Sequence, residues 1–427
     1  MIKKNVLVFP AGTEIANEII NSLKNNKSYE VILASSEFPS YADYRDSPVH
    51  SLPFCSDTNF LSRLNKLIKQ ENISFIIPAH DDVAYALSKN QNKIKAKTIG
   101  QSYFVNSIVR FKDKTYDFLR NKIPLGQIYE NKENIHSFPI FIKPKKGQGS
   151  LNSYKIKSRL ELDNFFINKN INDYILMECF TGTEYTIDCF SEKGEVIYFG
   201  ARSRDKTFKG ISVISTYIDD VTLNNEIETY ARIISKELSM HGVWFFQMMH
   251  DSKGQLKLLE IAPRVSGSMM LNRARGMNFV EAALYQAGGY NITPAINNVR
   301  VSIGRALIPV YKHNYEFDNL YIDFDDTLYL DEKRINSDLM RFIFDCKNEG
   351  KNIYLITKNK KRNLAEILRK FGIYAIFDGV IHLADTERKS DFMKKRALLV
   401  DDSFIERFEA IKSEHFAIDL SLCNINF

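Results

Sequence analysis

Both ends of this 427-residue chain alternate short apolar strands with amphipathic helices, and this alternation strongly constrains the possible folds. Near the start, apolar segments at 5–9, 31–34 and 75–78 are separated by segments at 15–23 and 60–70 with helical periodicity. A second alternating pattern opens with the strand at 320–322 and continues to the end. Strands joined through helices pair in parallel, so we predict an α/β protein with a parallel sheet near each end.

The region between these two patterns is organised differently. Strands are expected at 174–179, 185–190 and 242–248, together with a long helix at 225–238, interrupted only by short turns. A chain of this length with 44% apolar residues can build several cores. We therefore predict three domains, over residues 1–105, 106–312 and 317–427, the middle one of α+β type.

Charge and cysteine content narrow the class of protein. The net charge of +6 is uneven, because residues 317–427 carry −2 and the residues before them +8. Basic residues do not alternate with aromatic ones, which favours phosphorylated small molecules over nucleic acid as ligands. Five scattered cysteines fit a reducing compartment, and no apolar run approaches the ~20 residues that span a membrane. We expect a cytoplasmic protein that binds neither nucleic acid nor membranes.

The strongest chemical signal is the segment 258–264, an apolar strand that contains Glu260 and is followed by a proline and Arg264. A carboxylate in a buried strand is costly unless it meets a cation. An arginine can hold anionic oxygen through two parallel hydrogen bonds. Together they indicate a Mg²⁺–phosphate site, with a salt bridge at the strand end as the alternative.

Four other segments have compatible chemistry. A strand ends at Lys143 and is followed by the basic, glycine-rich turn 144–150. Segment 111–114 precedes a helix and puts Lys114 where it could reach a phosphate. Segment 177–188 joins two strands and carries two acids, Glu178 and Glu184. Gln247 is the single polar residue of the apolar strand 242–248.

In this order and spacing the segments resemble the ATP-grasp superfamily over residues 1–312, and most closely its carboxylate–amine ligase branch. The resemblance implies a parallel-sheet pre-ATP-grasp domain, then an ATP-grasp domain that binds ATP and Mg²⁺. The implied roles are phosphate binding by Lys114, Lys143 and the turn of Gly147, Gly149 and Ser150, adenine binding by Glu178 and Phe180, ribose binding by Glu184, Mg²⁺ binding by Gln247 and Glu260, and stabilisation of the transferred phosphate by Arg264.

The basic segment 200–210 is a candidate substrate loop. We predict that Arg202, Arg204 and Lys209 bind the substrate carboxylate or the phosphates, although a solvated basic hairpin would have the same composition. Arg273 and Arg275 could bind a substrate anion as well. For His80, Asp81 and Asp82 we favour a helix N-cap with acids in the first turn over catalysis.

The last region also ends its strands in functional groups. Asp323 and Asp325 follow the strand at 320–322, and Thr357 ends the next strand. Lys389 comes later, before a strand that ends in Asp401 and Asp402. Several carboxylates at the carboxyl ends of parallel strands would repel one another, so Mg²⁺ is expected.

This pattern resembles the haloacid-dehalogenase-like (HAD) phosphatase superfamily over residues 317–427, and implies a Rossmann-like domain without a cap. The implied roles are nucleophile for Asp323, general acid/base for Asp325, phosphate binding for Thr357 and Lys389, and Mg²⁺ binding for Asp323, Asp325, Asp401 and Asp402. Lys394 is a rival to Lys389. The alternative is a fold that has lost its chemistry and serves only for docking or dimerisation.

The combined prediction is a bifunctional enzyme, possibly a homodimer. An ATP-dependent ligase would join a small carboxylate to an amine through an acyl phosphate and release ADP and phosphate. A tethered Mg²⁺-dependent phosphatase would act on a related phosphorylated metabolite. The alternatives are an ATP-dependent kinase of a small metabolite and a nucleotide-binding regulatory protein with a non-catalytic HAD domain.

Overall fold

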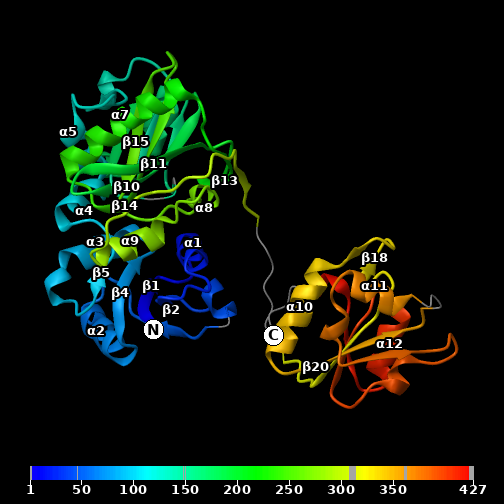
Figure 1. Cartoon of the computed structure of the whole chain (residues 1–427). Helices are drawn as coiled ribbons and strands as arrows, with labels where there is room; N and C mark the ends of the chain where they lie inside the picture. The colour runs from blue at the N-terminus through cyan, green and yellow to red at the C-terminus, as the bar shows by residue number, and fades with distance from the viewer. Residues whose placement is uncertain are drawn as a thin grey trace. The chain divides into compact units, whose positions relative to one another are not determined.

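The computed structural model describes residues 2–45, 47–147, 149, 151–306, 314–359 and 363–422. It divides the chain into two compact units, Met1–Leu307 and Ile308–Phe427, which are described separately (Figure 1). The predicted boundary between residues 105 and 106 lies within the first unit and remains a prediction.

The first unit begins with a five-stranded parallel sheet, the N-terminal sheet. Its strands, in spatial order, are β3 (Val49–Ser51), β2 (Tyr29–Ser35), β1 (Lys4–Phe9), β4 (Ile73–Pro78) and β5 (Lys97–Thr98). The helices of this region are α1 (Glu14–Ser22), α2 (Phe60–Gln70) and α3 (Asp81–Lys89). Residues of β1 contribute to two different cores, so both faces of the strand are covered. This explains its unbroken apolar run.

A four-stranded antiparallel sheet, here called the large sheet, forms the centre of the unit. Its strands are β11 (Glu195–Ser203), β10 (Glu184–Glu192), β14 (Gly242–His250) and β15 (Leu256–Ala262). Helix α7 (Val221–Leu238) covers one face, because Ile227, Ala231, Ile234 and Leu238 recur at helical spacing and are all buried. The Asp220 carboxylate caps this helix by accepting from Leu223 N at 2.7 Å.

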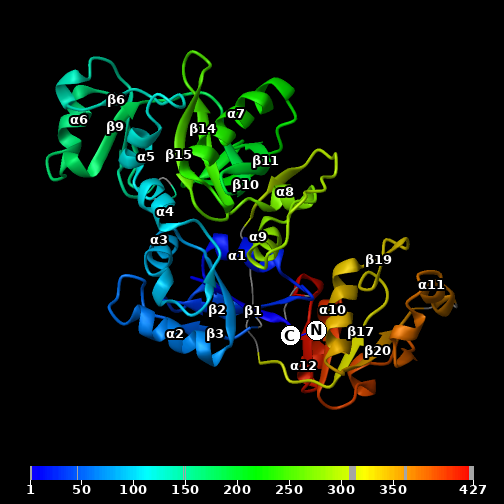
Figure 2. The ribbon, with the colours of Figure 1, turned by 60° about the vertical axis from the view of Figure 1, so that its left-hand side comes forward.

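A second four-stranded antiparallel sheet, the small sheet, lies beside helix α5 (Figure 2). It contains β6 (Ile128–Tyr129), β9 (Tyr174–Glu178), β7 (Ile140–Pro144) and β8 (Tyr154–Ile156), with helix α6 (Arg159–Phe165). The remaining elements of the first unit are α4 (Tyr103–Val109), α5 (Lys112–Leu119), β12 (Lys206–Phe208), β13 (Ile211–Thr216), α8 (Met270–Ala274), α9 (Phe279–Ala287) and β16 (Ser302–Gly304).

The second unit is built on a five-stranded parallel sheet. Its strands, in spatial order, are β21 (Gly379–His382), β20 (Asn352–Thr357), β17 (Asn319–Ile322), β22 (Ala397–Val400) and β23 (Phe416–Ile418). A short hairpin, β18 (Tyr329–Leu330) and β19 (Arg334–Ile335), and helices α10 (Ser337–Asn348), α11 (Leu364–Lys370) and α12 (Phe404–Lys412) complete it.

The predicted mixed α/β fold with parallel sheets is thus confirmed. Helix α2 has the predicted bounds of 60–70, and α7 begins four residues before the predicted 225. Within the described part of the chain, no helix is both long and apolar enough to cross a membrane.

Candidate functional site

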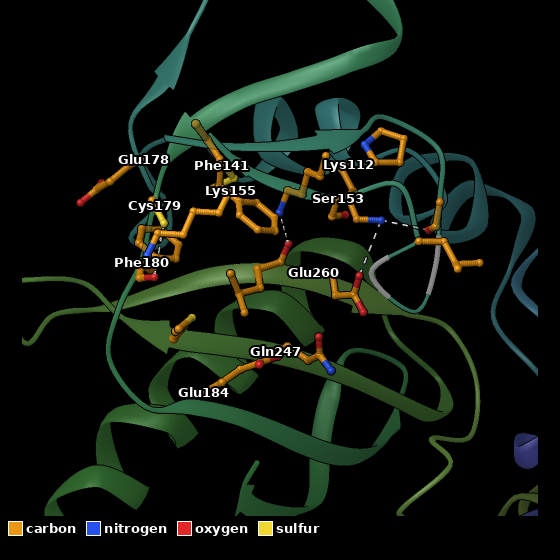
Figure 3. Close-up of a pocket in the computed structure, with 17 residues that line it drawn as sticks. Lys112, Phe141, Ser153, Lys155, Glu178, Cys179, Phe180, Glu184, Gln247 and Glu260 are labelled. Carbon is orange, nitrogen blue, oxygen red and sulfur yellow. Dashed lines mark hydrogen bonds and ion pairs between the residues drawn. The ribbon is translucent and has the colours of Figure 1, made fainter. Parts of the chain in front are cut away.

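An open cavity of about 270 Å³, the first cavity, lies between the small sheet and the large sheet (Figure 3). Strands β7 and β9 supply one wall, with Phe141, Lys143 and Glu178. Strands β14 and β15 supply the opposite wall, with Gln247 and Glu260. The structure therefore brings together residues that are far apart in the chain, such as Lys143 and Glu260, which are 117 residues apart.

Lys143 is a buried lysine in the wall of this cavity. Its Nζ donates to the backbone oxygen of Leu259 at 3.0 Å and to the hydroxyl of Tyr116. Burial lowers the pKa of Lys143 to about 7, and the nearby Lys112 ammonium adds to the shift. A buried lysine with a depressed pKa beside a second lysine fits a site that receives an anionic ligand.

Lys112, rather than the predicted Lys114, lines the cavity. Its Nζ donates to Gly147 O at 3.0 Å and lies 3.6 Å from Glu260 Oε2. Lys114 is exposed, and its ammonium lies 4.7 Å from the centre of the Phe111 ring. Residues two apart on a helix point in directions about 200° apart, so the two lysines cannot share one face.

The predicted metal ligands face each other. Gln247 and Glu260 are direct partners across β14 and β15. The side-chain amide of Gln247 is oriented so that both its nitrogen and its oxygen have a hydrogen-bond partner. Its nitrogen then donates to Glu260 Oε1 at 3.1 Å and its oxygen accepts from Arg204. Arg204 Nε lies 3.2 Å from Glu184 Oε1, and burial raises the pKa of Glu184. These residues form one polar cluster on the large sheet.

The predicted adenine and ribose residues also line the first cavity. Glu178 ends β9, and its carboxylate accepts from Gln127 N at 3.3 Å. Phe180 is buried and its ring packs against Gly126, where an added Cβ would lie 2.4 Å from the ring. Gly147 lines the cavity as well, whereas Gly149 lines a neighbouring one. Ser150 lies outside the described residues.

That neighbouring cavity, the second cavity, has a volume of about 390 Å³ and shares Gln247 and Glu260 with the first. Its wall contains the predicted substrate residues Arg202, Arg204 and Lys209. It also contains Arg264 and Arg305, and the latter had no role in our sequence analysis. The second cavity is therefore strongly basic.

Two of these arginines have intramolecular partners that the sequence did not reveal. Arg264 makes a bidentate ion pair with Asp81, with distances of 2.6 and 3.0 Å, instead of facing the cavity freely. Arg202 is 2% exposed and pairs with the buried Asp188, Nε to Oδ2 at 3.0 Å. The Asp188 carboxylate also accepts from Ser266 and Asn272 at 2.8 and 3.0 Å.

Other predictions for polar residues in the first unit have clear outcomes. His80 caps α3, since its Nδ1 accepts from Asp82 N at 3.1 Å, and both aspartates lie in the first turn. The N-cap interpretation is confirmed, although both aspartates also form ion pairs with basic side chains. Arg273 pairs with Glu18 at 2.9 Å, and the Arg275 guanidinium lies 3.4 Å from the centre of the Tyr217 ring. Both arginines, which were predicted to bind a substrate anion, therefore contact other side chains of the protein.

The second unit gathers most of its predicted residues at the carboxyl ends of β17, β20 and β22. Lys389 Nζ lies 2.5 Å from Asp323 Oδ1 and 2.6 Å from Asp401 Oδ2. One oxygen each from Asp323, Asp401 and Asp402 lies within 4.8 Å of the others. Burial raises the pKa of Asp323 to about 7 although Lys389 opposes the shift. Three clustered carboxylates fit a divalent cation.

The other predicted residues of this unit differ in their placement. Asp325 is exposed, and both its oxygens accept from Asn359 Nδ2, at 2.7 and 2.8 Å. It is not one of the three clustered carboxylates. Thr357 is buried at the end of β20, and its hydroxyl accepts from Asn359 N at 3.0 Å. Lys394 is exposed and binds the Tyr354 hydroxyl, so the geometry favours Lys389 over this rival.

Solved structures of three enzymes are similar to this chain. They are the biotin carboxylase domain of 2-oxoglutarate carboxylase from Hydrogenobacter thermophilus, crystallised with MgADP and bicarbonate (TM-score 0.57, covering 68% of this chain and 71% of that one), an L-amino acid ligase from Bacillus licheniformis (0.53, 67% and 74%) and N5-carboxyaminoimidazole ribonucleotide synthetase from Thermotoga maritima (0.54, 70% and 80%). Each is 16% identical in sequence, so the likeness shows a shared fold.

The fold and the sequence match agree that the first unit contains an ATP-grasp-like domain. Within it, residues 170–305 match the family model described as "ATP-grasp in the biosynthetic pathway with Ter operon". No curated protein sequence matches the chain significantly. The predicted resemblance to the ATP-grasp superfamily is confirmed at this level, whereas the phosphatase resemblance of residues 317–427 remains a prediction.

Proposed function

We propose that residues 1–312 form an ATP-dependent ligase that joins a small carboxylate to an amine. The observation that carries this proposal is the pair of adjoining cavities. The first is lined by Lys112 and Lys143 and the second by several arginines, and Gln247 and Glu260 lie on the wall of both. A phosphoryl group bound in the first cavity would therefore lie next to an anion bound in the second.

The reaction needs ATP because a carboxylate cannot be attacked by an amine directly, since the leaving group would be oxide. Transfer of the γ-phosphoryl group to a carboxylate oxygen gives an acyl phosphate and ADP. The amine nitrogen then forms a bond to the acyl carbon, the bond to the phosphate oxygen breaks, and phosphate leaves. The protein contributes positioning and neutralisation of charge.

Within this proposal, residues of the first cavity bind ATP. Lys143 and Lys112 hold the phosphates. The negative charge of the phosphates is then the counter-charge for the buried ammonium of Lys143. Glu178 and Phe180 contact adenine, and Glu184 contacts the ribose. Gln247 and Glu260 would hold Mg²⁺, which when bound neutralises phosphate oxygens and polarises the phosphorus. The Glu260 carboxylate fits a hard cation, whereas the Gln247 amide oxygen, which accepts from Arg204, would have to turn towards it. ATP oxygens would supply further ligands.

The second cavity would bind the carboxylate. Arg204 and Lys209 are the candidates for direct contact, because Arg204 pairs with Glu184 through Nε, whereas Arg202 and Arg264 each hold a carboxylate of the protein through two nitrogens. These two arginines would instead fix the shape of the wall. The similarity to an L-amino acid ligase supports this reaction class, and the match to an ATP-grasp family of a biosynthetic pathway agrees with it. The substrates are small molecules, and a homodimer is the assembly we expect.

We further propose that residues 317–427 form a phosphatase that acts on a related phosphorylated metabolite. Asp323 would be the nucleophile for phosphorus, with Asp325 as the acid/base and Thr357 and Lys389 binding the phosphate oxygens. Asp323, Asp401 and Asp402 would hold Mg²⁺, which when bound offsets the negative charge of the phosphate and the carboxylates. The support is the Lys389–carboxylate cluster, whose raised carboxyl pKa values reflect crowded, buried acids.

Two variants test the two activities in one experiment. In the presence of a small-metabolite extract, Glu260→Gln should abolish ADP release from Mg·ATP and leave hydrolysis of p-nitrophenyl phosphate intact. Asp323→Asn should do the reverse, since it removes the nucleophile of the other site. If ADP release survives in Glu260→Gln, the ATP site has been wrongly assigned. Loss of both activities in either variant would contradict independent sites.

A further inference from the structure

Asp82 contacts two cations that belong to other elements of the first unit. Its Oδ1 accepts from Arg110 Nε at 3.0 Å and lies 3.0 Å from Lys146 Nζ. Arg110 directly follows α4, and Lys146 belongs to the basic turn after β7. The side chain of Arg110 is only 7% exposed. A buried guanidinium that loses its carboxylate is strongly destabilising, so Asp82 is an important partner for it.

Arg110 and Lys146 are both connected to Gly147, the middle residue of the basic turn 144–150. Arg110 Nη1 donates to Gly147 O at 3.3 Å, and Lys112 Nζ donates to the same oxygen at 3.0 Å. Lys146 is the residue before this glycine in the chain. Figure 3 shows that Lys112 reaches from this oxygen towards Glu260 across the cavity wall. The position of Lys112 therefore depends on where Gly147 is held.

These contacts connect residues of the first cavity with residues of another cavity. Asp82 and Lys146 line a third cavity of about 730 Å³, which also contains Gly12 and His80 at the carboxyl ends of β1 and β4. Lys112 and Gly147 line the first cavity. Burial would raise the pKa of Asp82, but Arg110 and Lys146 hold it at about 2, so the carboxylate stays charged at neutral pH.

We propose that Asp82 is a positioning residue for ATP binding, acting through Arg110 and Lys146. By holding Arg110 and Lys146 it fixes the position of Gly147 in the basic turn, and Gly147 in turn directs Lys112 into the first cavity. The inference rests on the proposed function of that cavity and adds a residue that touches neither ATP nor metal. Without the carboxylate, Arg110 and Lys146 lose their shared anchor, and Gly147 and Lys112 move with them.

The test is Mg·ATP binding to the full chain, measured by calorimetry. Asp82→Asn keeps the shape and removes the charge, and it should weaken binding about tenfold. Asp82→Glu keeps the charge and should recover part of the affinity. Lys146→Met should weaken binding too. In the double variant with Asp82→Asn, the fold-loss of affinity for Mg·ATP should be smaller than the product of the two single fold-losses, because both residues act on the same turn.

The control is Asp117→Asn on helix α5, where the carboxylate pairs only with the exposed Arg120 among the described residues. It should bind Mg·ATP like the wild type. Unchanged affinity in Asp82→Asn would overturn the inference. Equal losses in Asp82→Asn and Asp82→Glu with a lowered melting temperature would also overturn it, in favour of a purely structural role. Failure of the wild type to bind Mg·ATP would instead overturn the proposed function.

Discussion

The depressed pKa of Lys143 gives the first cavity a measurable signature. With a pKa of about 7, this lysine is largely uncharged in the empty site at pH 8. ATP phosphates beside it favour the charged form and raise its pKa. We therefore predict uptake of up to about one proton per ATP bound at pH 8, and much less at pH 6, where the lysine is already protonated.

Calorimetry in two buffers with different ionisation enthalpies measures this proton uptake directly. Because the nucleotide phosphates titrate at lower pH, the comparison is cleanest at pH 8. Lys143→Met should bind ATP more weakly and take up no proton at that pH. Binding by the wild type with no buffer dependence at pH 8 would contradict the assigned role of Lys143.

The buried pair of Arg202 and Asp188 makes a second prediction about single residues. Asp188→Ala leaves the guanidinium without its counter-charge in a site that is almost fully buried. Breaking such a pair costs about 3–5 kcal/mol. Urea denaturation should show this loss in the first unit, and Asp117→Asn on the surface should change the stability by less than about 0.5 kcal/mol. A similarly small effect of Asp188→Ala would show that the network contributes little.

At the scale of elements, the turn before β6 controls the shape of the predicted adenine site. An alanine at Gly126 would place its Cβ 2.4 Å from the Phe180 ring, so the ring must move. Since this ring lines the first cavity, Gly126→Ala should raise the KM for ATP by about tenfold, while kcat changes less. Hydrolysis of p-nitrophenyl phosphate should not change. An unaltered KM would show that adenine does not contact this ring.

The elements that carry the site were readable from the sequence because each is a plain apolar strand. Lys143, Gln247 and Glu260 are the conspicuous polar residues of β7, β14 and β15, which belong to antiparallel sheets. The parallel sheets near the two ends of the chain follow from the strand–helix alternation. The choice of Lys112 over Lys114 was not readable, because it depends on the phase of a helix that starts at this position. The short strands β12, β13 and β16 have no clear period either.

Contacts between distant segments were also beyond the sequence. Arg264 was predicted to face a phosphate, yet Asp81, 183 residues away along the chain, accepts from its Nε and Nη2. The local sequence pattern predicted only that Asp81 is an acid in the first turn of a helix. The same holds for Asp82, whose partners come from two further elements. Long-range ion pairs are set by the tertiary packing of the unit, which composition and spacing do not encode.

At the scale of the whole molecule, two units with distinct sites share one chain. A tether raises the effective concentration of a product of one site near the other, provided the linker allows the approach. This would give a reason for the fusion of the ligase and the phosphatase that we propose. The central claim, however, concerns the first unit and its reaction with ATP.

The most direct test of that claim is mass spectrometry of the Asp323→Asn protein incubated with Mg·ATP and a small-metabolite extract. Removing the proposed nucleophile of the second unit should preserve phosphorylated species long enough to detect them. Our account predicts ADP together with a new mass equal to an acid plus an amine minus water. ADP with only a phosphorylated metabolite would contradict the ligase and indicate a kinase, and bound but unchanged ATP would indicate a regulatory nucleotide site.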